Sequence, residues 1–414
     1  MTQILFRDAK VFDGWSAELI DGADVLVEGG TIREVSTKPL AVRGEVETID
    51  CGGRVLMPGL IDAHVHVYAA NVNLMKVVRW PGTYLAHFAA RFLEASLDRG
   101  FTTLRDMGGG DVGLAGALRD GLVTGPRLVY GGRVISQTGG HGDLRPGDSE
   151  LDDFAGCGCA CRADSIAVVA DGVDAVRKAV REELRRGASH IKIMGSGGVA
   201  SPTDPLDRCQ YSEEEIRAAV EEAERMGKYV AAHCHPAEAV RRCVELGVRS
   251  IEHATLVDDD TAALMAAKGA FAVPTMATIF ALLDRGAALG LPPASLEKLK
   301  TVGDHALESL DILHRAGARM GFGTDLLGEL HTRQTSEFEL RARILPPIEI
   351  LRSACAVNAE LMGESGRLGV IAEGAAADLL VVDGDPLKDI ELLAGQGEAL
   401  RVIMSQGRLH RREI

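Results

Sequence analysis

The chain has 414 residues, of which 46% are hydrophobic and 25% are charged, and its formal net charge is −15. This composition predicts a folded, soluble protein, and the length favours one large domain with a smaller one over a single core. The acidic excess argues against nucleic acid and anionic membrane surfaces as partners, because phosphate groups bind to basic surfaces.

The N-terminal residues show no basic region followed by a long apolar core, and no apolar run is long enough to span a bilayer. Most of the eight cysteines are scattered, which fits reduced thiols in a cytoplasm. Cys157, Cys159 and Cys161 are the exception. Their spacing lacks the CxxC pairing of common zinc sites, so a loop with reduced thiols is favoured over a soft-metal site or a disulfide. We therefore expect a cytoplasmic protein and leave homo-oligomerisation open.

Residues 1–58 consist of short strand-like runs separated by Asp-Gly and Gly-Gly turns, which predicts a small antiparallel sheet. From residue 59 to residue 361 the pattern changes, and strand-like runs alternate with amphipathic helical stretches. The predicted strands of this middle part are 60–67, 102–107, 127–135, 190–195, 229–235, 250–256, 270–276 and 319–325.

Helical patterns lie between most of these strands, at 171–187, 212–226, 236–246 and 258–268. The second of them opens with a capping-box pattern at Ser212. Strands that are each followed by a crossover predict an α/β fold in which 59–361 forms a (β/α)₈ TIM barrel. Residues 362–414 return to strands with Gly-rich turns. We expect them to join residues 1–58 in one small composite β-sandwich beside the barrel.

Two histidines stand two residues apart in the first predicted barrel strand, at His64 and His66. Side chains at that spacing point to the same face of a strand. Two imidazoles that converge on one point suit a metal ion better than they suit an apolar core. The alternative is a strand with two incidental histidines.

Further ionisable residues fall on other predicted barrel strands, mostly near their carboxyl ends: Lys192, His233, His235, His253 and Asp325. Barrel enzymes place their reactive groups at these ends. Taken singly, such a histidine is more often a hydrogen-bonded core residue than a ligand, and such an aspartate can cap the next helix. Taken together, so many buried ionisable groups require pairing or a metal. Nitrogen and oxygen donors without thiolate favour Zn²⁺, and they also suit Mn²⁺ or Fe²⁺.

These residues make the chain resemble the amidohydrolase superfamily over its whole length. The motifs that carry the resemblance are Pro58-Gly59-Leu60-Ile61-Asp62-Ala63-His64-Val65-His66, Lys192, His233, His253, Gly321-Phe322-Gly323-Thr324-Asp325 and the tail 369–379. Within the superfamily the chain is similar to the imidazolonepropionase-like group, which includes Xaa-Pro dipeptidases (prolidases). The segments 139–143, 191–202 and 210–212 support this narrower likeness.

The resemblance implies a centre of two divalent metal ions, expected to be Zn²⁺. One ion would be held by His64, His66 and Asp325, and the other by His233 and His253. Lys192 would bridge them as N6-carboxylysine, the carbamate that forms with CO₂. The resemblance also implies that a hydroxide bridging the metals attacks the carbonyl carbon, with Asp325 as the proton shuttle.

Substrate contacts are implied at two further histidines. His141 would contact the reacting carbonyl or its oxyanion, and His235 would contact the substrate. Many relatives carry Tyr at the second position, so this chain departs from the pattern there. For His141 the alternative is a loop residue in a Gly-rich turn, and for His235 it is the N-terminal residue of a helix.

The implied substrates are small molecules, either dipeptides or N-acyl amino acids, with Xaa-Pro dipeptides as the leading expectation. The alternatives are a carboxypeptidase for Xaa-Arg/Lys or hydrophobic dipeptides and an N-acyl amino acid or aryl amide hydrolase. The loops offer both acidic and basic residues, so charge does not decide between them: Asp143, Asp148, Glu150, Asp204, Asp207, Arg145 and Arg208. A distant alternative is a non-catalytic barrel scaffold, which would have lost ligands, whereas all six ligand positions are filled.

Overall fold

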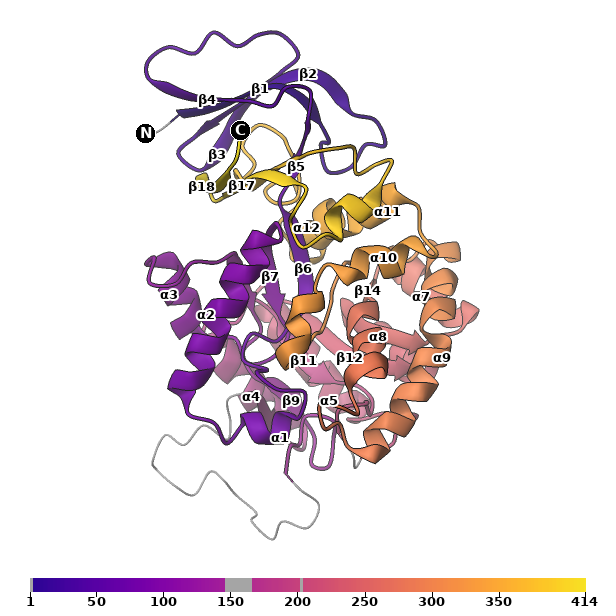
Figure 1. Ribbon diagram of the computed structural model, residues 1–414. Coiled ribbons are helices and arrows are strands. Elements are labelled where there is room, and N and C mark those ends of the chain that lie inside the picture. Colours follow the sequence, from indigo (N-terminus) through magenta and orange to yellow (C-terminus); the bar gives the residue numbers. More distant parts are fainter. Residues whose placement is uncertain (1–2, 146–165, 202–203) are drawn as a thin grey trace.

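The computed structural model describes residues 3–145, 166–201 and 204–414. Figure 1 shows a β-rich part that carries both chain ends and, below it in this view, a barrel surrounded by helices. The cysteine run at 157–161 lies outside the described residues.

The two chain ends combine in one sheet, in the order β18-β17-β16-β5-β1-β2-β3 with β4 beside β1. β5 and β16 join the ends by antiparallel pairing, with Val55 opposite Val382. The composite β-structure predicted for the two ends is thus confirmed. The strands are β1 (Gln3–Val11), β2 (Ile20–Glu28), β3 (Thr31–Ser36), β4 (Val46–Asp50), β5 (Val55–Pro58), β16 (Leu379–Val382), β17 (Leu400–Ser405) and β18 (Arg408–Arg412).

The expectation of a purely antiparallel sheet at the N-terminus is wrong. β1 is antiparallel to β2 but parallel to β4 and β5. The β2–β3 hairpin lies between β1 and β4 in the chain, so β4 returns in the direction of β1.

The barrel is built from parallel strands in two sheets, β6-β7-β8 and β10-β9-β11-β12-β13-β14-β15. This confirms the predicted barrel. Its strands are β6 (Leu60–Val65), β7 (Phe101–Asp106), β8 (Arg127–Tyr130), β9 (Val134–Ser136), β10 (Ala167–Val169), β11 (Ile191–Met194), β12 (Val230–Pro236), β13 (Ser250–Leu256), β14 (Phe271–Val273) and β15 (Arg319–Met320).

Helices cover the barrel, and the four predicted ones are α4 to α7. The capping box is confirmed at α5, where Ser212 Oγ accepts from the Glu215 backbone and the Glu215 side chain accepts from the Ser212 backbone. The helices are α1 (Leu74–Val77), α2 (Gly82–Asp98), α3 (Val112–Arg119), α4 (Val173–Arg185), α5 (Glu213–Arg225), α6 (Ala237–Glu245), α7 (Asp259–Lys268), α8 (Met276–Arg285), α9 (Pro293–Arg315), α10 (Ser336–Ala342), α11 (Pro347–Arg352) and α12 (Asn358–Leu361), with short turns η2 (Gly328–Arg333), η3 (Ser353–Val357) and η4 (Ile390–Leu393).

The third predicted strand, 127–135, is interrupted. It forms β8 and β9 with a break at 131–133, and β10, which was not predicted, pairs with β9. The break has a steric cause at Gly132, where φ is 73° and an added Cβ would lie 2.3 Å from Glu183 Oε2. Glu183 also accepts from the backbone and the side chain of Arg133, which holds the chain in this bend.

Two predicted strands that carry metal-binding candidates end early. β6 stops at Val65, so His66 follows the strand, and β15 stops at Met320, so Asp325 lies in irregular chain with φ 53°. The barrel nevertheless closes here through backbone hydrogen bonds. Ala63 N–H donates to Phe322 O at 2.8 Å, and Asp325 N–H donates to His64 O at 2.8 Å. These bonds place Asp325 beside the first histidine.

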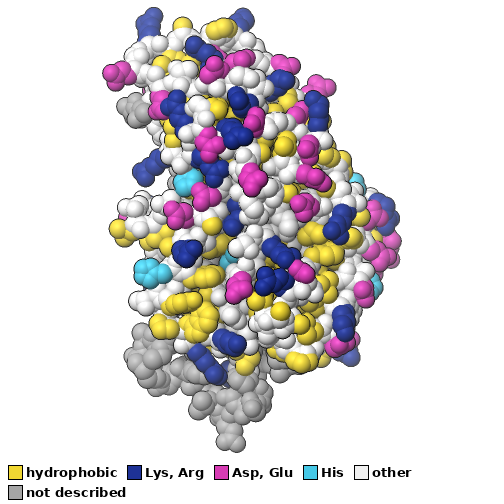
Figure 2. Space-filling view, viewed as in Figure 1, with side chains coloured by type: hydrophobic (Ala, Val, Ile, Leu, Met, Phe, Trp, Pro, Cys, Tyr) yellow, Lys and Arg dark blue, Asp and Glu magenta, His cyan; other side chains and the backbone are white. Residues whose placement is uncertain are grey.

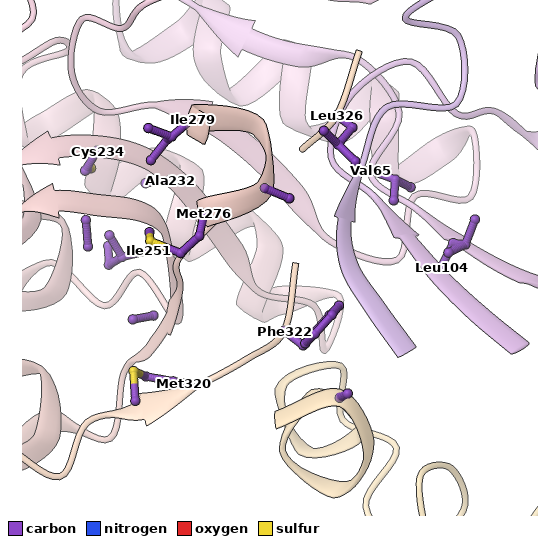
Figure 3. Close-up of a cluster of buried hydrophobic side chains, with 14 of the residues drawn as sticks. Val65, Leu104, Ala232, Cys234, Ile251, Met276, Ile279, Met320, Phe322 and Leu326 are labelled. Atoms are coloured by element: carbon purple, nitrogen blue, oxygen red, sulfur yellow. The ribbon is translucent and has the colours of Figure 1, made fainter. Parts of the chain in front are cut away.

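Apolar side chains from opposite parts of the barrel meet in a continuous core (Figure 3). Val65 on β6, Ile251 on β13 and Phe322 after β15 are almost fully buried. Phe322 also lies against Phe338 of α10, with ring centroids 4.6 Å apart. This core holds the strand ends in fixed positions, which a site built from several strands requires.

On the face shown in Figure 2, acidic and basic side chains are interspersed. Within the described ranges, no helix combines the length and the apolar character needed to cross a bilayer.

We predict that Asn358→Leu lowers the free energy of unfolding by about 2–4 kcal/mol, because buried backbone groups lose their partners. Asn358 is fully buried and joins both sides of the closure: its Nδ2 donates to Ile61 O at 2.7 Å and to Phe322 O at 2.8 Å. Guanidinium denaturation measures the change. Asn73→Leu is the control, because Asn73 forms no side-chain cap at α1. Equal stability of the two variants would contradict this role.

Candidate metal centre

Three side chains around the barrel closure converge on one point. His64 Nε2 lies 3.4 Å and His66 Nε2 lies 3.2 Å from the same oxygen, Asp325 Oδ1. Two ligand atoms bound tetrahedrally to one Zn²⁺ at 2.0–2.1 Å are about 3.3 Å apart. The separations therefore fit a shared divalent ion.

His253 and His233 face the same region from β13 and β12. Ligand atoms of His64, His253 and Asp325 all lie within 4.8 Å of one another. His253 Nδ1 is 2.8 Å from Thr275 Oγ1, and the His233 ring centroid is 4.5 Å from that of His253. His233 Nε2 lies 3.3 Å from Gly197 O, which places a proton on Nε2, so that Nδ1 is the nitrogen that could bind a metal ion.

Hydrogen bonds to the remaining ring nitrogens orient the first two histidines. His64 Nδ1 lies 2.8 Å from Glu252 Oε2, and His66 Nδ1 lies 3.0 Å from Gly108 O. Both partners accept, so each ring carries a proton on Nδ1 and turns its Nε2 toward Asp325. Partners of this kind are typical of metal-binding histidines.

Glu252 is itself held by a buried cation. Arg105 Nη2 donates to both Glu252 oxygens, at 2.8 and 3.0 Å, and Arg105 Nε donates to Ala63 O at 2.6 Å. Burial alone would raise the pKa of Glu252, but Arg105 and His64 outweigh burial and hold it well below its usual range. The carboxylate behind His64 thus stays ionised.

Lys192 lies on β11 and is 2% exposed. Among the residues that the structure describes, none hydrogen-bonds its ammonium group. Burial lowers the pKa of Lys192 to about 8, against the opposing attraction of Glu252 and Asp325. The neutral amine is therefore about a tenth of the population at pH 7, far more than for an ordinary lysine.

The electrostatic setting also favours metal binding by His64 and Asp325. Burial lowers the pKa of His64 to about 4, so the imidazole is neutral at pH 7. Burial raises the pKa of Asp325, but His64, His66 and Lys192 outweigh it and hold the pKa below its usual value. Neutral imidazoles and an ionised carboxylate are the forms that bind divalent cations.

The two histidines predicted to contact substrate lie beside these groups. His141 follows β9, and its ring stacks on His233 with centroids 4.3 Å apart. His235 ends up close to His253, at 5.1 Å between ring centroids, and its Nδ1 lies 2.6 Å from Thr255 Oγ1.

The histidines, Lys192 and Asp325 line one cavity. Every site residue predicted from sequence lines it: His64, His66, His141, Lys192, His233, His235, His253 and Asp325. The rest of the wall is largely apolar and includes Leu144, Ile166, Met194, Val199, Ile279, Leu282, Leu299 and Val302. A polar floor of ionisable side chains thus meets an apolar wall.

The sequence interpretation missed Glu252 and Arg105. Both sit inside runs that were predicted as buried barrel strands, and a charged residue in such a run signals a buried partner. That signal was available, but the identity of the partner was not, because 147 positions separate the two residues.

The chain matches the model of the Amidohydrolase family over residues 55–409. A solved structure of a prolidase in complex with N-methylphosphonate-L-proline is 47% identical, with a TM-score of 0.95 over 99% of this chain and 100% of that chain. Ochratoxinase of Aspergillus niger is 33% identical over 354 residues, covering 82% of this chain and 72% of the relative.

Imidazolonepropionase of Deinococcus radiodurans is 27% identical, covering 94% of this chain and 93% of the relative. These matches agree with the fold and with the His/His/Asp group that can hold a divalent metal ion. The chain therefore belongs to the amidohydrolase family, whose members are hydrolases.

Proposed function

We propose that this protein is a binuclear metal-dependent dipeptidase that cleaves the amide bond of Xaa-Pro substrates. The observation that carries the proposal is the convergence of His64, His253 and Asp325 with Lys192 in one cavity. The likeness to a prolidase that binds N-methylphosphonate-L-proline supports the choice of substrate.

In this proposal His64, His66 and Asp325 hold one Zn²⁺, and His233 and His253 hold the other. Lys192, in the form of N6-carboxylysine, is a ligand of both ions. When bound, the two ions lower the pKa of water and polarise the scissile carbonyl. The donor set is made of nitrogen and oxygen atoms, which suits Zn²⁺.

The state of Lys192 supports its modification. An amine attacks CO₂ only in its neutral form, and burial lowers the pKa of Lys192 to about 8. The amine nitrogen bonds to the carbon of CO₂ and releases one proton, and the product is a carbamate anion. That change replaces a cation that would repel metal ions with an anionic oxygen ligand, which explains why a buried lysine stands among ligands.

Asp325 is proposed to move the proton. Its carboxylate is ionised, and it faces the cavity at 19% side-chain exposure. It accepts the proton that the attacking water loses and passes it to the leaving nitrogen. An amide nitrogen leaves poorly until it is protonated, so this transfer matters for the rate.

The charges around the cavity favour an uncharged substrate side chain. Asp143 is bound by Arg145 at 2.7 Å, and Asp204 is bound by His141 and the backbone. Asp207 is highly exposed. Asp148 and Glu150 lie outside the described residues. Within the described residues, an Arg or Lys side chain would therefore meet an apolar wall, whereas proline fits one.

A second candidate is an N-acyl amino acid or aryl amide hydrolase on the same centre. The apolar wall and the likeness to ochratoxinase favour it. Such a hydrolase would use the same metal ligands and the same proton transfer. It would differ from the dipeptidase in the substrate group that packs against the apolar wall of the cavity.

We predict that the zinc-loaded protein hydrolyses Xaa-Pro dipeptides with a kcat/KM at least about tenfold above that for Xaa-Arg, because the described wall of the cavity offers a buried guanidinium mainly apolar side chains. A dipeptide panel with detection of released amino acid measures this. Faster hydrolysis of Xaa-Arg would contradict the assignment of Xaa-Pro as substrate. Turnover of N-acyl amino acids alone would favour the N-acyl amino acid hydrolase.

We predict a carbamate at Lys192. Zinc-loaded protein equilibrated with carbon-13 bicarbonate should show a carbamate carbon resonance. The resonance should be missing in Lys192→Met, because methionine has no amine that could capture CO₂. Lys300→Met, at a 63% exposed side chain, should keep the resonance. An identical spectrum for both variants would exclude the modification.

We predict that Glu252→Gln weakens zinc binding about 10- to 100-fold, because the anion that orients His64 is lost. Competition with a fluorescent chelator measures the affinity. Glu297→Gln, at a 74% exposed side chain, is the matched control. An unchanged affinity in Glu252→Gln would show that the hydrogen bond to His64 does not assist binding.

A further inference from the structure

The His141 imidazole is held by a second carboxylate that no metal ion needs. His141 Nδ1 lies 3.2 Å from Asp204 Oδ2, and both residues are less than one-tenth exposed. A carboxylate accepts, so Nδ1 carries the proton. Within the described part of the chain, no group hydrogen-bonds the other ring nitrogen, Nε2. The ring is thus fixed at one end and available to a ligand at the other.

Asp204 is fixed in turn by its surroundings. Its Oδ2 also accepts from Gly198 N–H at 3.0 Å and from Gln210 Nε2 at 3.2 Å. Gln210 Oε1 accepts from the backbone N–H of His141 at 3.0 Å. The side-chain amide of Gln210 therefore hydrogen-bonds both Asp204 and the backbone of His141.

Lys298 of α9 clamps the loop that carries Asp204. Its ammonium donates to the carbonyl oxygens of Gly198 at 3.0 Å and Ser201 at 2.6 Å, and also to that of Asp204. Three carbonyls match the three donors of an ammonium group. Lys298 Nζ is also 3.6 Å from Asp204 Oδ1, so its charge balances the buried carboxylate.

The backbone at Gly198 packs closely against the rings of His141 and His233. A Cβ at this glycine would lie 2.4 Å from His141 Cε1 and 2.6 Å from His233 Nε2. Glycine therefore lets the backbone lie against both imidazoles, and on its other side the His141 ring stacks on His233.

We propose that Asp204 is a positioning residue that acts through His141, and that Lys298 fixes the loop that carries Asp204. The proposal rests on the proposed function, in which His141 contacts the reacting carbonyl oxygen. Asp204 accepts from Nδ1 and fixes the ring plane, so that Nε2 points to the substrate. To donate to the carbonyl oxygen the ring also carries a proton on Nε2, and the Asp204 carboxylate balances the charge of this imidazolium. Preorganised donors of this kind act on the transition state more than on the bound substrate.

A double-mutant cycle tests this on the full-length, zinc-loaded protein with the best Xaa-Pro substrate. Asp204→Ala should lower kcat about 100-fold with KM changed less than about threefold, and Asp204→Asn, which keeps an accepting oxygen, should lose about tenfold. In a His141→Asn background, Asp204→Ala should lower kcat by less than about a further twofold, because Asp204 acts only by positioning the His141 ring, which this background lacks. Asp207→Asn, at a 70% exposed side chain, should match the parent.

A spectroscopic readout accompanies the kinetics. Besides the resonance of His64 beside Glu252, the wild-type protein should show a second downfield imidazole N–H proton resonance, that of His141. This His141 resonance should disappear in Asp204→Ala and His141→Asn and stay in Asp207→Asn, with zinc content unchanged in all variants. A full 100-fold loss from Asp204→Ala in the His141→Asn background, or a His141 resonance that survives Asp204→Ala, would overturn the proposal. An inactive wild-type protein would instead overturn the proposed function, and the positioning role with it.

Discussion

The Glu252 carboxylate is fully buried inside the barrel, and its charge must be balanced where it stands. Arg105 balances it from one side and His64 hydrogen-bonds it from the other. Removing one member of such a pair typically costs about 3–5 kcal/mol, because the other charge is left uncompensated. The same contact that the fold needs for charge balance therefore sets the ring of His64, and with it the geometry of the centre.

The barrel closure brings a carboxylate, Asp325, next to this histidine. Asp62 Oδ1 accepts from the backbone N–H groups of His64 and Thr324, at 3.2 and 3.1 Å, and its Oδ2 accepts from Thr324 Oγ1 at 2.7 Å. One buried carboxylate thus joins β6 to the chain that follows β15. Asp325 follows Thr324 directly, so its carboxylate lies beside His64.

Much of this arrangement could be predicted from sequence, because the metal-binding candidates lie within or next to strands with recognisable patterns. The His64–His66 spacing, Lys192 among apolar residues, and Asp325 after a Gly-rich run were sufficient to expect one centre. The strand ends were wrong at β6 and β15, because the irregular turn that brings Asp325 inward depends on tertiary hydrogen bonds.

The contacts that hold the site residues in position could not be predicted from sequence. Lys298 lies 94 residues from Asp204, on a helix whose sequence shows only an ordinary amphipathic pattern. Nothing in local sequence indicates that its ammonium meets three loop carbonyls. Contacts of this kind arise from the folded topology, and they decide how sharply His141 is held.

The central claim is that this cavity holds two divalent ions joined through Lys192. Anomalous diffraction at the zinc edge from crystals grown with zinc and bicarbonate tests it directly. The account predicts two peaks about 3.5–4 Å apart, one beside His66 and one beside His233, with carbamate density at Lys192 between them. A single peak at full zinc loading, with an unmodified Lys192, would contradict the account.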